Sequence, residues 1–177
     1  MESEWSGDIE KAFFSAEKFD AHRVLLQPEY EYSARTTKDS YYVIGVDVGR
    51  KGCTTEAVII KVTPQPQGAA IKSVVNLYSY EDLHFEDQAK AIKELYYKYR
   101  AKKLVIDANG LGIGLIDYMV KPQYDHNSNT LLYPDFGVDN DEEGFYKQYK
   151  TNRTEHGAMY LIKAQAPLNT EAHSYMQ

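Results

Sequence analysis

From residue 41 onward, the apolar positions recur with the periods of regular secondary structure. Residues 41–48, YYVIGVDV, are almost continuously apolar and rich in β-branched side chains, which predicts a central buried strand. Residues 55–62 and 71–80, TEAVIIKV and IKSVVNLYSY, predict two further strands. A glycine turn and then a loop rich in proline and glycine separate the three strands, so we expect antiparallel hairpins.

The period then changes to that of a helix. In residues 86–103, apolar side chains recur at steps of three and four, and lysines and acids fill the other face. This pattern predicts an amphipathic helix of about four turns. Residues 103–108, KLVIDA, predict a short strand, and the helix before it requires this strand to run parallel to an earlier one. A short helix over 112–120, a fifth strand over 130–136 and a helix-like tail complete the pattern.

The order of the predicted elements defines the expected fold class. Three antiparallel strands, a crossover helix and a parallel strand form the mixed α/β sheet of the ribonuclease H-like fold, with the first and fourth strands as parallel neighbours. We expect residues 1–40 to be a lead-in segment and residues 41–177 to form the domain. Residues 134–144, PDFGVDNDEEG, hold five acids and no base and predict a solvated loop.

Composition narrows the function classes. The 177-residue chain has a formal net charge of -6, which is not the usual electrostatic footprint of a protein that binds nucleic acid. Its one cysteine, Cys53, excludes a disulfide within the chain and a cysteine-based zinc site. The sequence shows no signal peptide and no apolar run of about 18 residues, so we expect an intracellular protein without a membrane partner.

Two carboxylates carry the main chemical signal. Asp47 ends the first predicted strand and Asp107 ends the fourth. If these strands are parallel neighbours, a spacing of about 4.8 Å brings both side chains to one edge of the sheet. Close carboxylates repel each other, and a divalent cation such as Mg²⁺ or Mn²⁺ removes that penalty. Such a pair is typical of two-metal phosphodiester hydrolysis, in which one metal activates water and the other stabilises the leaving 3′-oxygen.

Neighbouring residues provide candidate contacts to DNA. Arg50 and Lys51 follow Asp47 and can hold phosphates, while Asn109 and Gly110 follow Asp107, where a glycine lets a phosphate backbone approach closely. Arg50 and Lys51 are equally consistent with a solvated turn. For either aspartate alone, a structural role as the cap of a turn or of a following helix is the better explanation, and only the pair in this strand order favours a metal site. Glu56 opens the second predicted strand beside Asp47, and an exposed acid at a strand end explains it best.

These two stretches resemble a known family. YVIGVDVGRKGCTTEAVIIKV and KLVIDANGLGIGLIDYM are similar to the nuclease domain of the large terminase subunit of tailed bacteriophages and related prophages. In that family the first strand ends in a catalytic aspartate followed by a small residue and arginine, which Asp47 and Arg50 match. The fourth strand carries an acid and a glycine-rich turn, Asp-x-x-Gly-x-Gly, which Asp107 and Gly110 match.

The resemblance implies a role in viral DNA packaging. It implies an endonuclease that cuts concatemeric double-stranded DNA, joined to an ATPase domain and acting with a portal and a small terminase subunit. The setting would be the bacterial host cytoplasm, transiently on the procapsid. Residues 1–40 would then be the linker from an ATPase domain, although the sequence has no G-x-x-x-x-G-K-[ST] pattern.

The resemblance also implies an incomplete site. The family places a third metal-binding acid on a late helix, and Glu155 and Glu171 do not lie in that motif. We therefore expect a C-terminally truncated nuclease domain with weak or no activity by itself.

Three other interpretations stay open. VDVG followed by threonine is also typical of one lobe of an actin- or sugar-kinase-like ATPase, which tight ATP binding would favour. A Holliday-junction resolvase-like nuclease would use the same acids on branched DNA. An interaction module with two structural aspartates would show no response to metal.

Overall fold

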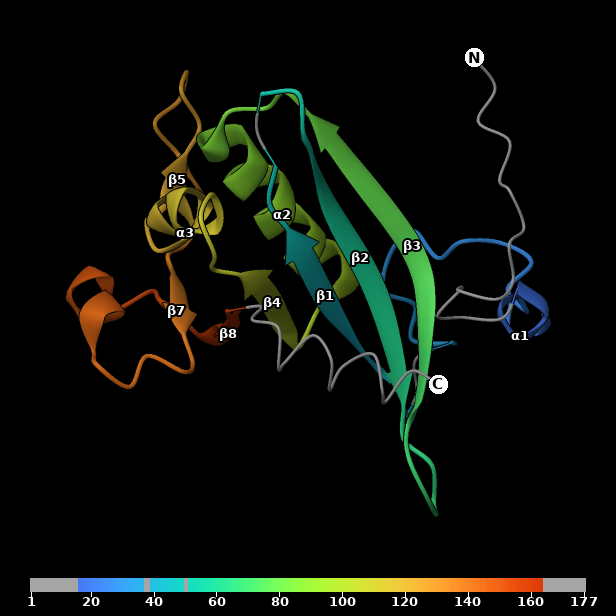
Figure 1. Cartoon of the computed structure of the whole chain (residues 1–177). Coiled ribbons are helices and arrows are strands. Elements are labelled where there is room, and N and C mark those ends of the chain that lie inside the picture. The colour runs from blue at the N-terminus through green and yellow to red at the C-terminus, as the bar shows by residue number, and fades with distance from the viewer. Residues whose placement is uncertain (1–15, 37–38, 50, 164–177) are drawn as a thin grey trace. The chain divides into compact units, whose positions relative to one another are not determined.

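A six-stranded mixed sheet organises the protein. The computed structural model describes residues 16–36, 39–49 and 51–163. The strands lie in the order β3-β2-β1-β4-β8-β7 (Figure 1). They are β1 (Tyr41–Asp47), β2 (Thr54–Thr63), β3 (Ile71–Glu81), β4 (Lys103–Asp107), β7 (Phe136–Val138) and β8 (Glu155–Ile162). The first three pair antiparallel, and β4, β8 and β7 continue the sheet with parallel pairings. This is the ribonuclease H-like arrangement, and it confirms the predicted fold class.

Helices α2 (Phe85–Tyr99) and α3 (Gly112–Met119) pack beside each other and share one hydrophobic core with the sheet (Figure 1). The remaining elements are the two-stranded sheet of β5 (Gln123–Tyr124) and β6 (Leu131–Tyr133) and the 3-10 helix η2 (Phe145–Tyr149). All of these belong to one compact unit, Glu29–Gln165. Helix α1 (Ala16–Ala21) belongs to a second unit.

Strand alternation explains the core. Tyr42, Ile44 and Val46 of β1 are buried, while the residues between them are only half-buried, so one face of the strand points into the core. The apolar stripe predicted for the helix, including Ile92 and Leu95, is buried against this face. Burial of each such large aliphatic side chain stabilises the fold by about 1.5–3 kcal/mol.

The structure corrects the predicted fifth strand. Residues 130–136 do not form one strand, because Pro134 interrupts them and cannot donate to a strand ladder. The residues before it form β6 in the small sheet, and those after it form β7 at the edge of the main sheet. The strand that pairs with β4 is instead β8, which the sequence pattern did not predict.

The solvated loop predicted over 134–144 is wrong in its first half. Asp135 is 1% exposed, and β7 is buried along its whole length. The Asp135 carboxylate accepts hydrogen bonds from Thr151 and Thr154, which compensate for its removal from water. The helix-like pattern of the tail lies outside the described residues.

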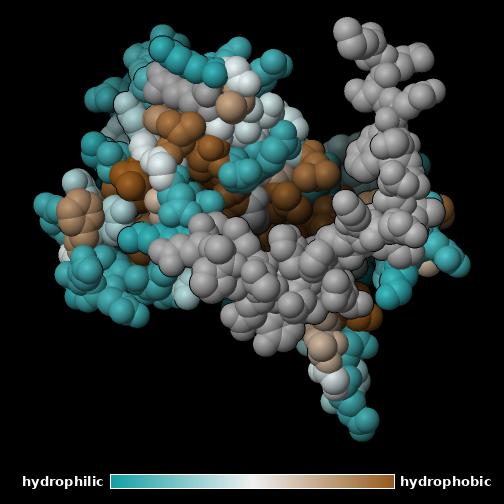
Figure 2. Space-filling view, viewed as in Figure 1, coloured by the Kyte–Doolittle hydropathy of each residue, from teal (hydrophilic) through white to brown (hydrophobic). Residues whose placement is uncertain are grey.

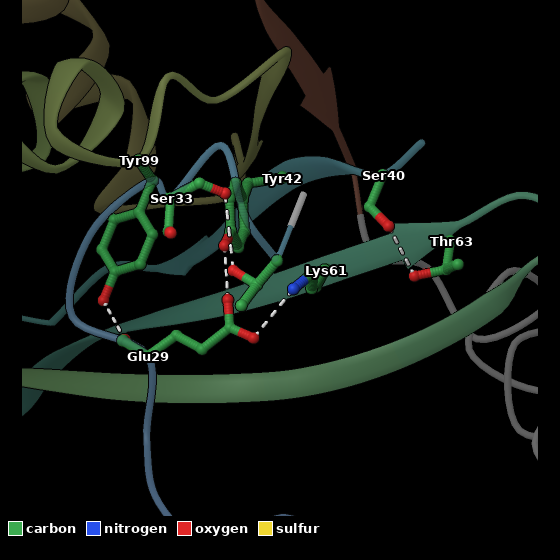
Figure 3. A network of polar contacts seen from close by, with 8 residues as sticks. Glu29, Ser33, Ser40, Tyr42, Lys61, Thr63 and Tyr99 are labelled. Atoms are coloured by element: carbon green, nitrogen blue, oxygen red, sulfur yellow. Dashed lines mark hydrogen bonds and ion pairs between the residues drawn. The ribbon is translucent and has the colours of Figure 1, made fainter. Parts of the chain in front are cut away.

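Glu29 anchors the start of the compact unit to the sheet (Figure 3). Its carboxylate accepts hydrogen bonds from the Tyr42 hydroxyl and from Lys61 Nζ, the latter at 2.9 Å. Its backbone carbonyl accepts from the Tyr99 hydroxyl at 2.6 Å and from Asn76 Nδ2 at 3.0 Å. One residue thus joins β1, β2, β3 and the end of α2.

The sheet face opposite the core is apolar and half-exposed. Successive cross-strand pairs place one row of side chains across it: Leu77, Val58, Gly45, Val105 and Tyr160. Leu77 and Tyr160 at the two ends of this row are exposed, and the three between them are half-buried. Figure 2 shows apolar residues gathered in the middle of the view, with hydrophilic residues along its upper and left edges.

Candidate metal centre at the ends of β1 and β4

Asp47 and Asp107 lie at the same edge of the sheet, as predicted from the strand order. Strands β1 and β4 are parallel, and their register runs to the pair Val46 and Ile106. The two aspartates are the next residue on each strand, so their Cα atoms are about one strand spacing, roughly 4.8 Å, apart. Both follow a core-facing residue, so both side chains point to the face opposite α2.

The two aspartates have different surroundings. Asp47 is exposed, and no hydrogen bond or ion pair from the described residues reaches its carboxylate. Asp107 is half-buried, and its Oδ1 atom accepts a hydrogen bond of 2.9 Å from the Asn109 backbone N–H. This contact is the turn-capping role expected for a strand-end aspartate, and it leaves Oδ2 for a ligand.

Glycines shape the turn after Asp107. Gly110 has φ +50°, a left-handed conformation that favours glycine. At Gly112, the first residue of α3, an added Cβ would overlap the Asp107 carbonyl oxygen. The glycine-rich turn is therefore required for α3 to begin so close to the end of β4.

A buried polar group braces the turn after Asp47. The Thr55 hydroxyl accepts a hydrogen bond of 2.9 Å from the Gly49 N–H and donates one of 2.8 Å to Gln88 Oε1. The Gln88 amide donates in turn to the Gly49 carbonyl at 3.0 Å and to the Leu83 carbonyl at 2.9 Å. Thr55 and Gln88 are at most 1% exposed, so this brace holds the backbone two residues beyond Asp47 away from water. The sequence pattern gave no signal for it, because the partners lie on β2 and α2.

Glu56 lies beside Asp47 in the sheet, as its position in the sequence suggested. It pairs with Asp47 across β1 and β2, and paired residues point to the same face of a sheet. Its carboxylate nevertheless accepts a hydrogen bond of 2.6 Å from Ser79 Oγ on β3, the strand on the other side of β2. Glu56 is therefore directed away from Asp47.

The structure describes three of the four residues predicted to contact DNA. Arg50 lies outside the described residues. Lys51 is exposed with φ +46°, and Asn109 is exposed in the turn after Asp107 together with Gly110. Lys51 and Asn109 thus follow the two aspartates at one edge of the sheet, and their side chains are accessible.

Glu155, one candidate for a third acid, lies far from the aspartate pair. Glu155 opens β8, whereas Asp107 pairs with Ile162 at the other end of that strand, seven residues or roughly 23 Å away. The Glu155 carboxylate accepts a hydrogen bond from the Tyr97 hydroxyl at 3.2 Å. Glu171 lies outside the described residues.

A cavity of about 610 Å³ opens beside Asp107 at the carboxyl ends of β4, β7 and β8. Ala108 lines it together with Phe145 and Tyr146, and the acids Asp141, Glu142 and Glu143 and the base Lys163 also border it. Ligands of open α/β sheets commonly bind outside the carboxyl ends of the strands. The acidic stretch after β7 therefore borders this cavity, whereas neither Asp47 nor Asp107 lines it.

Within residues 16–36, 39–49 and 51–163, no three His, Cys, Asp or Glu side chains are close enough to hold a metal together. No helix among these residues is long and apolar enough to cross a membrane.

The comparisons with known proteins give one structural likeness. No family model and no curated protein matches the chain. The chain is similar to the crystal structure of the large terminase nuclease from thermophilic phage G20c, solved with bound magnesium, at 15% identity and a TM-score of 0.49. The likeness covers 89% of this chain and 66% of that one.

Proposed function

We propose that this chain is the metal-dependent endonuclease part of a viral DNA-packaging terminase and that it cuts DNA by two-metal phosphodiester hydrolysis. The observation that carries the proposal is the placement of Asp47 and Asp107 at adjacent ends of the parallel strands β1 and β4. A structural role in turn capping accounts for Asp107, but it does not account for the exposed carboxylate of Asp47. The motifs around both aspartates resemble those of the terminase nucleases.

The donor set fits Mg²⁺ or Mn²⁺. Carboxylate oxygens are the hard ligands that these ions prefer, and Mg²⁺ commonly binds one or two carboxylates while keeping several waters and substrate phosphates. Asp47 and the free Oδ2 atom of Asp107 supply such oxygens from neighbouring strands. Bound metal would activate the attacking water and stabilise the leaving oxygen.

The protein residues have separate tasks in this proposal. Asp47 and Asp107 hold the metals, and the brace of Thr55 and Gln88 fixes the backbone that follows Asp47. Lys51 and Asn109 are exposed at the same edge and can bind phosphates that flank the cut. Arg50 has the same proposed role.

The wider proposal concerns the setting. In a terminase, the substrate would be concatemeric double-stranded DNA, and the partners would be an ATPase domain, a portal and a small subunit. Resolvase-like cutting of branched DNA would use the same two aspartates, so the choice of DNA substrate separates these two nucleases.

The test is nicking of supercoiled plasmid DNA in Mn²⁺ or Mg²⁺. We expect weak, metal-dependent nicking that falls by at least about 100-fold in Asp47→Asn and in Asp107→Asn, because each change removes a ligand from the metals that drive the reaction. Asp117→Asn, at an exposed position on α3, serves as the matched control and should nick as the unchanged chain does. Nicking that survives both site substitutions, or tight ATP binding without nicking, would contradict the proposal.

A further inference from the structure

The small sheet of β5 and β6 is an arm that leaves the main body and returns to it. The arm, Pro122–Tyr133, begins after helix α3 and ends before β7. Two residue pairs form its ladder, Gln123 with Tyr133 and Tyr124 with Leu131. A two-stranded hairpin of this size is unstable by itself, so the arm depends on its contacts with the body.

A single buried lysine joins both ends of the arm. Lys93 on α2 is fully buried, although the sequence pattern placed the lysines of this helix on its solvent face. Its Nζ atom donates to the Lys121 carbonyl at 2.7 Å and to the Pro134 carbonyl at 2.9 Å. These carbonyls belong to the residues just before and just after the arm. The side chain therefore closes the neck of the arm.

Full burial favours a neutral amine over an ammonium ion here, because Nζ forms no ion pair with a carboxylate of the described residues. The two carbonyls match the two N–H groups of a neutral amine, whereas an ammonium ion carries a third. Besides these carbonyls, the Phe136 ring has its centroid 5.0 Å from Nζ, and the Asp135 carboxylate interacts with the amine through its charge. A ring face only partly replaces the water that a buried charge has lost.

We propose that the arm Pro122–Tyr133 is a movable element controlled by the protonation of Lys93. The arm opens when this lysine is charged, because opening returns the ammonium ion to water, and it closes when the lysine is neutral. The cavity of about 330 Å³ between the arm and the two helices would change with it, since Gln123 and Tyr124 of the arm line its wall.

The charged groups around Lys93 support this direction. Burial lowers the pKa of Lys93 to about 7, and the nearby Asp135 carboxylate only partly opposes that shift. Burial raises the pKa of Asp135, but hydrogen bonds from Thr151 and Thr154 outweigh this effect, so the carboxyl has a lowered pKa and stays ionised. On α2 itself, Lys90 and Glu94 are exposed to solvent. At the neck of the arm, the amine donates to the neutral backbone carbonyls of Lys121 and Pro134.

The sign of the pH dependence follows from linkage. The closed arm holds Lys93 with a pKa near 7, whereas a solvated lysine has a pKa near 10.5. Between these values, the open arm binds more protons than the closed arm. Closure therefore strengthens as the pH rises from about 7 towards 10.5 and is weakest below pH 7.

Hydrogen exchange of the arm amides, corrected for intrinsic rates, tests the proposal. In the unchanged protein, the equilibrium constant for opening of the arm should fall by up to about tenfold for each pH unit above pH 7. This slope corresponds to the release of one proton when the arm closes. Amides of α2 serve as the internal reference for global unfolding. Lys93→Met should abolish the slope, while Lys90→Met, an exposed lysine on the same helix, should keep it.

Each outcome decides the question. An arm whose exchange is independent of pH, a slope that persists in Lys93→Met, or arm and α2 amides that change together would overturn the proposal. If Lys93→Met does not fold, the ¹³Cε signal of Lys93 in the unchanged protein decides. This signal must titrate near pH 7, where the protection of the arm amides against exchange begins to increase. A titration midpoint near 10.5 would overturn the proposal.

Discussion

At the scale of single residues, buried polar side chains are what the sequence pattern predicted least well. Asp47 and Asp107 were predictable, because each ends an apolar run at a strand terminus. Lys93 and Thr55 were not, because their partners are backbone and amide groups on other elements. Residue type alone places both on the surface, and only the fold supplies the groups that replace water.

The brace at Gly49 can be tested by removing one hydroxyl. Thr55→Val keeps the shape of the side chain but leaves the buried Gly49 N–H without its acceptor. We expect a loss of about 2 kcal/mol in the free energy of unfolding, measured by urea denaturation. Thr54→Val, at the exposed neighbouring position, should change stability by less than about 0.5 kcal/mol. Equal effects of the two substitutions would show that the brace contributes nothing.

At the scale of elements, the spacing of apolar residues and the glycine and proline residues between them predicted the first four strands and α2. In β1 and β4 the burial alternates along the whole strand, and in β2 it alternates as far as Ile60. In α2 the buried residues recur at steps of three and four. Strand β8 escaped prediction because EHGAMYLI opens with polar residues and a glycine, and only Ala158 and Met159 are fully buried. The predicted fifth strand failed because Pro134 divides its apolar residues between two sheets.

The junction of β4 and α3 depends on the absence of one side chain. Gly112→Ala would drive a Cβ into the Asp107 carbonyl oxygen, so the end of β4 would have to move. We expect a loss of about 3 kcal/mol in the free energy of unfolding, seen as a lower Tm. The matched control is Gly45→Ala in β1, where no atom lies within 4 Å of the added Cβ and stability should rise slightly. A tolerated Gly112→Ala would mean that this turn is not tightly packed.

At the scale of the whole molecule, buried tyrosines make the fold sensitive to alkali. Burial raises the pKa of Tyr80 to about 12, and repulsion from Tyr78 and Glu94 adds to the shift. Burial likewise raises the pKa of Tyr99 on α2. Tyr97 is partly exposed, and its pKa is raised by the burial of part of its side chain and by the Glu155 carboxylate, to which it donates a hydrogen bond. The chain has 16 tyrosines. Those with a raised pKa should lose their protons at a higher pH than the exposed ones and so form a separate phase of the titration.

Alkaline titration should therefore unfold the protein. An unfolded tyrosine loses its proton near pH 10, so the stability that depends on neutral Tyr80 is complete below pH 10 and is lost as the pH rises through about 12. We expect two phases in the tyrosinate absorbance, the second coinciding with loss of the far-ultraviolet circular dichroism signal. One phase near pH 10 with unchanged circular dichroism would contradict this prediction.

The central claim is that Asp47 and Asp107 together hold a divalent metal, and thermal unfolding with and without Mn²⁺ tests it most directly. A ligand that binds only the folded state raises Tm, and saturation at about 100 times Kd corresponds to about 2.7 kcal/mol. We predict that Mn²⁺ raises the Tm of the unchanged chain and of Asp117→Asn, and that Asp47→Asn and Asp107→Asn each abolish the increase. An unchanged Tm in Mn²⁺, or an increase that survives either site substitution, would contradict the account.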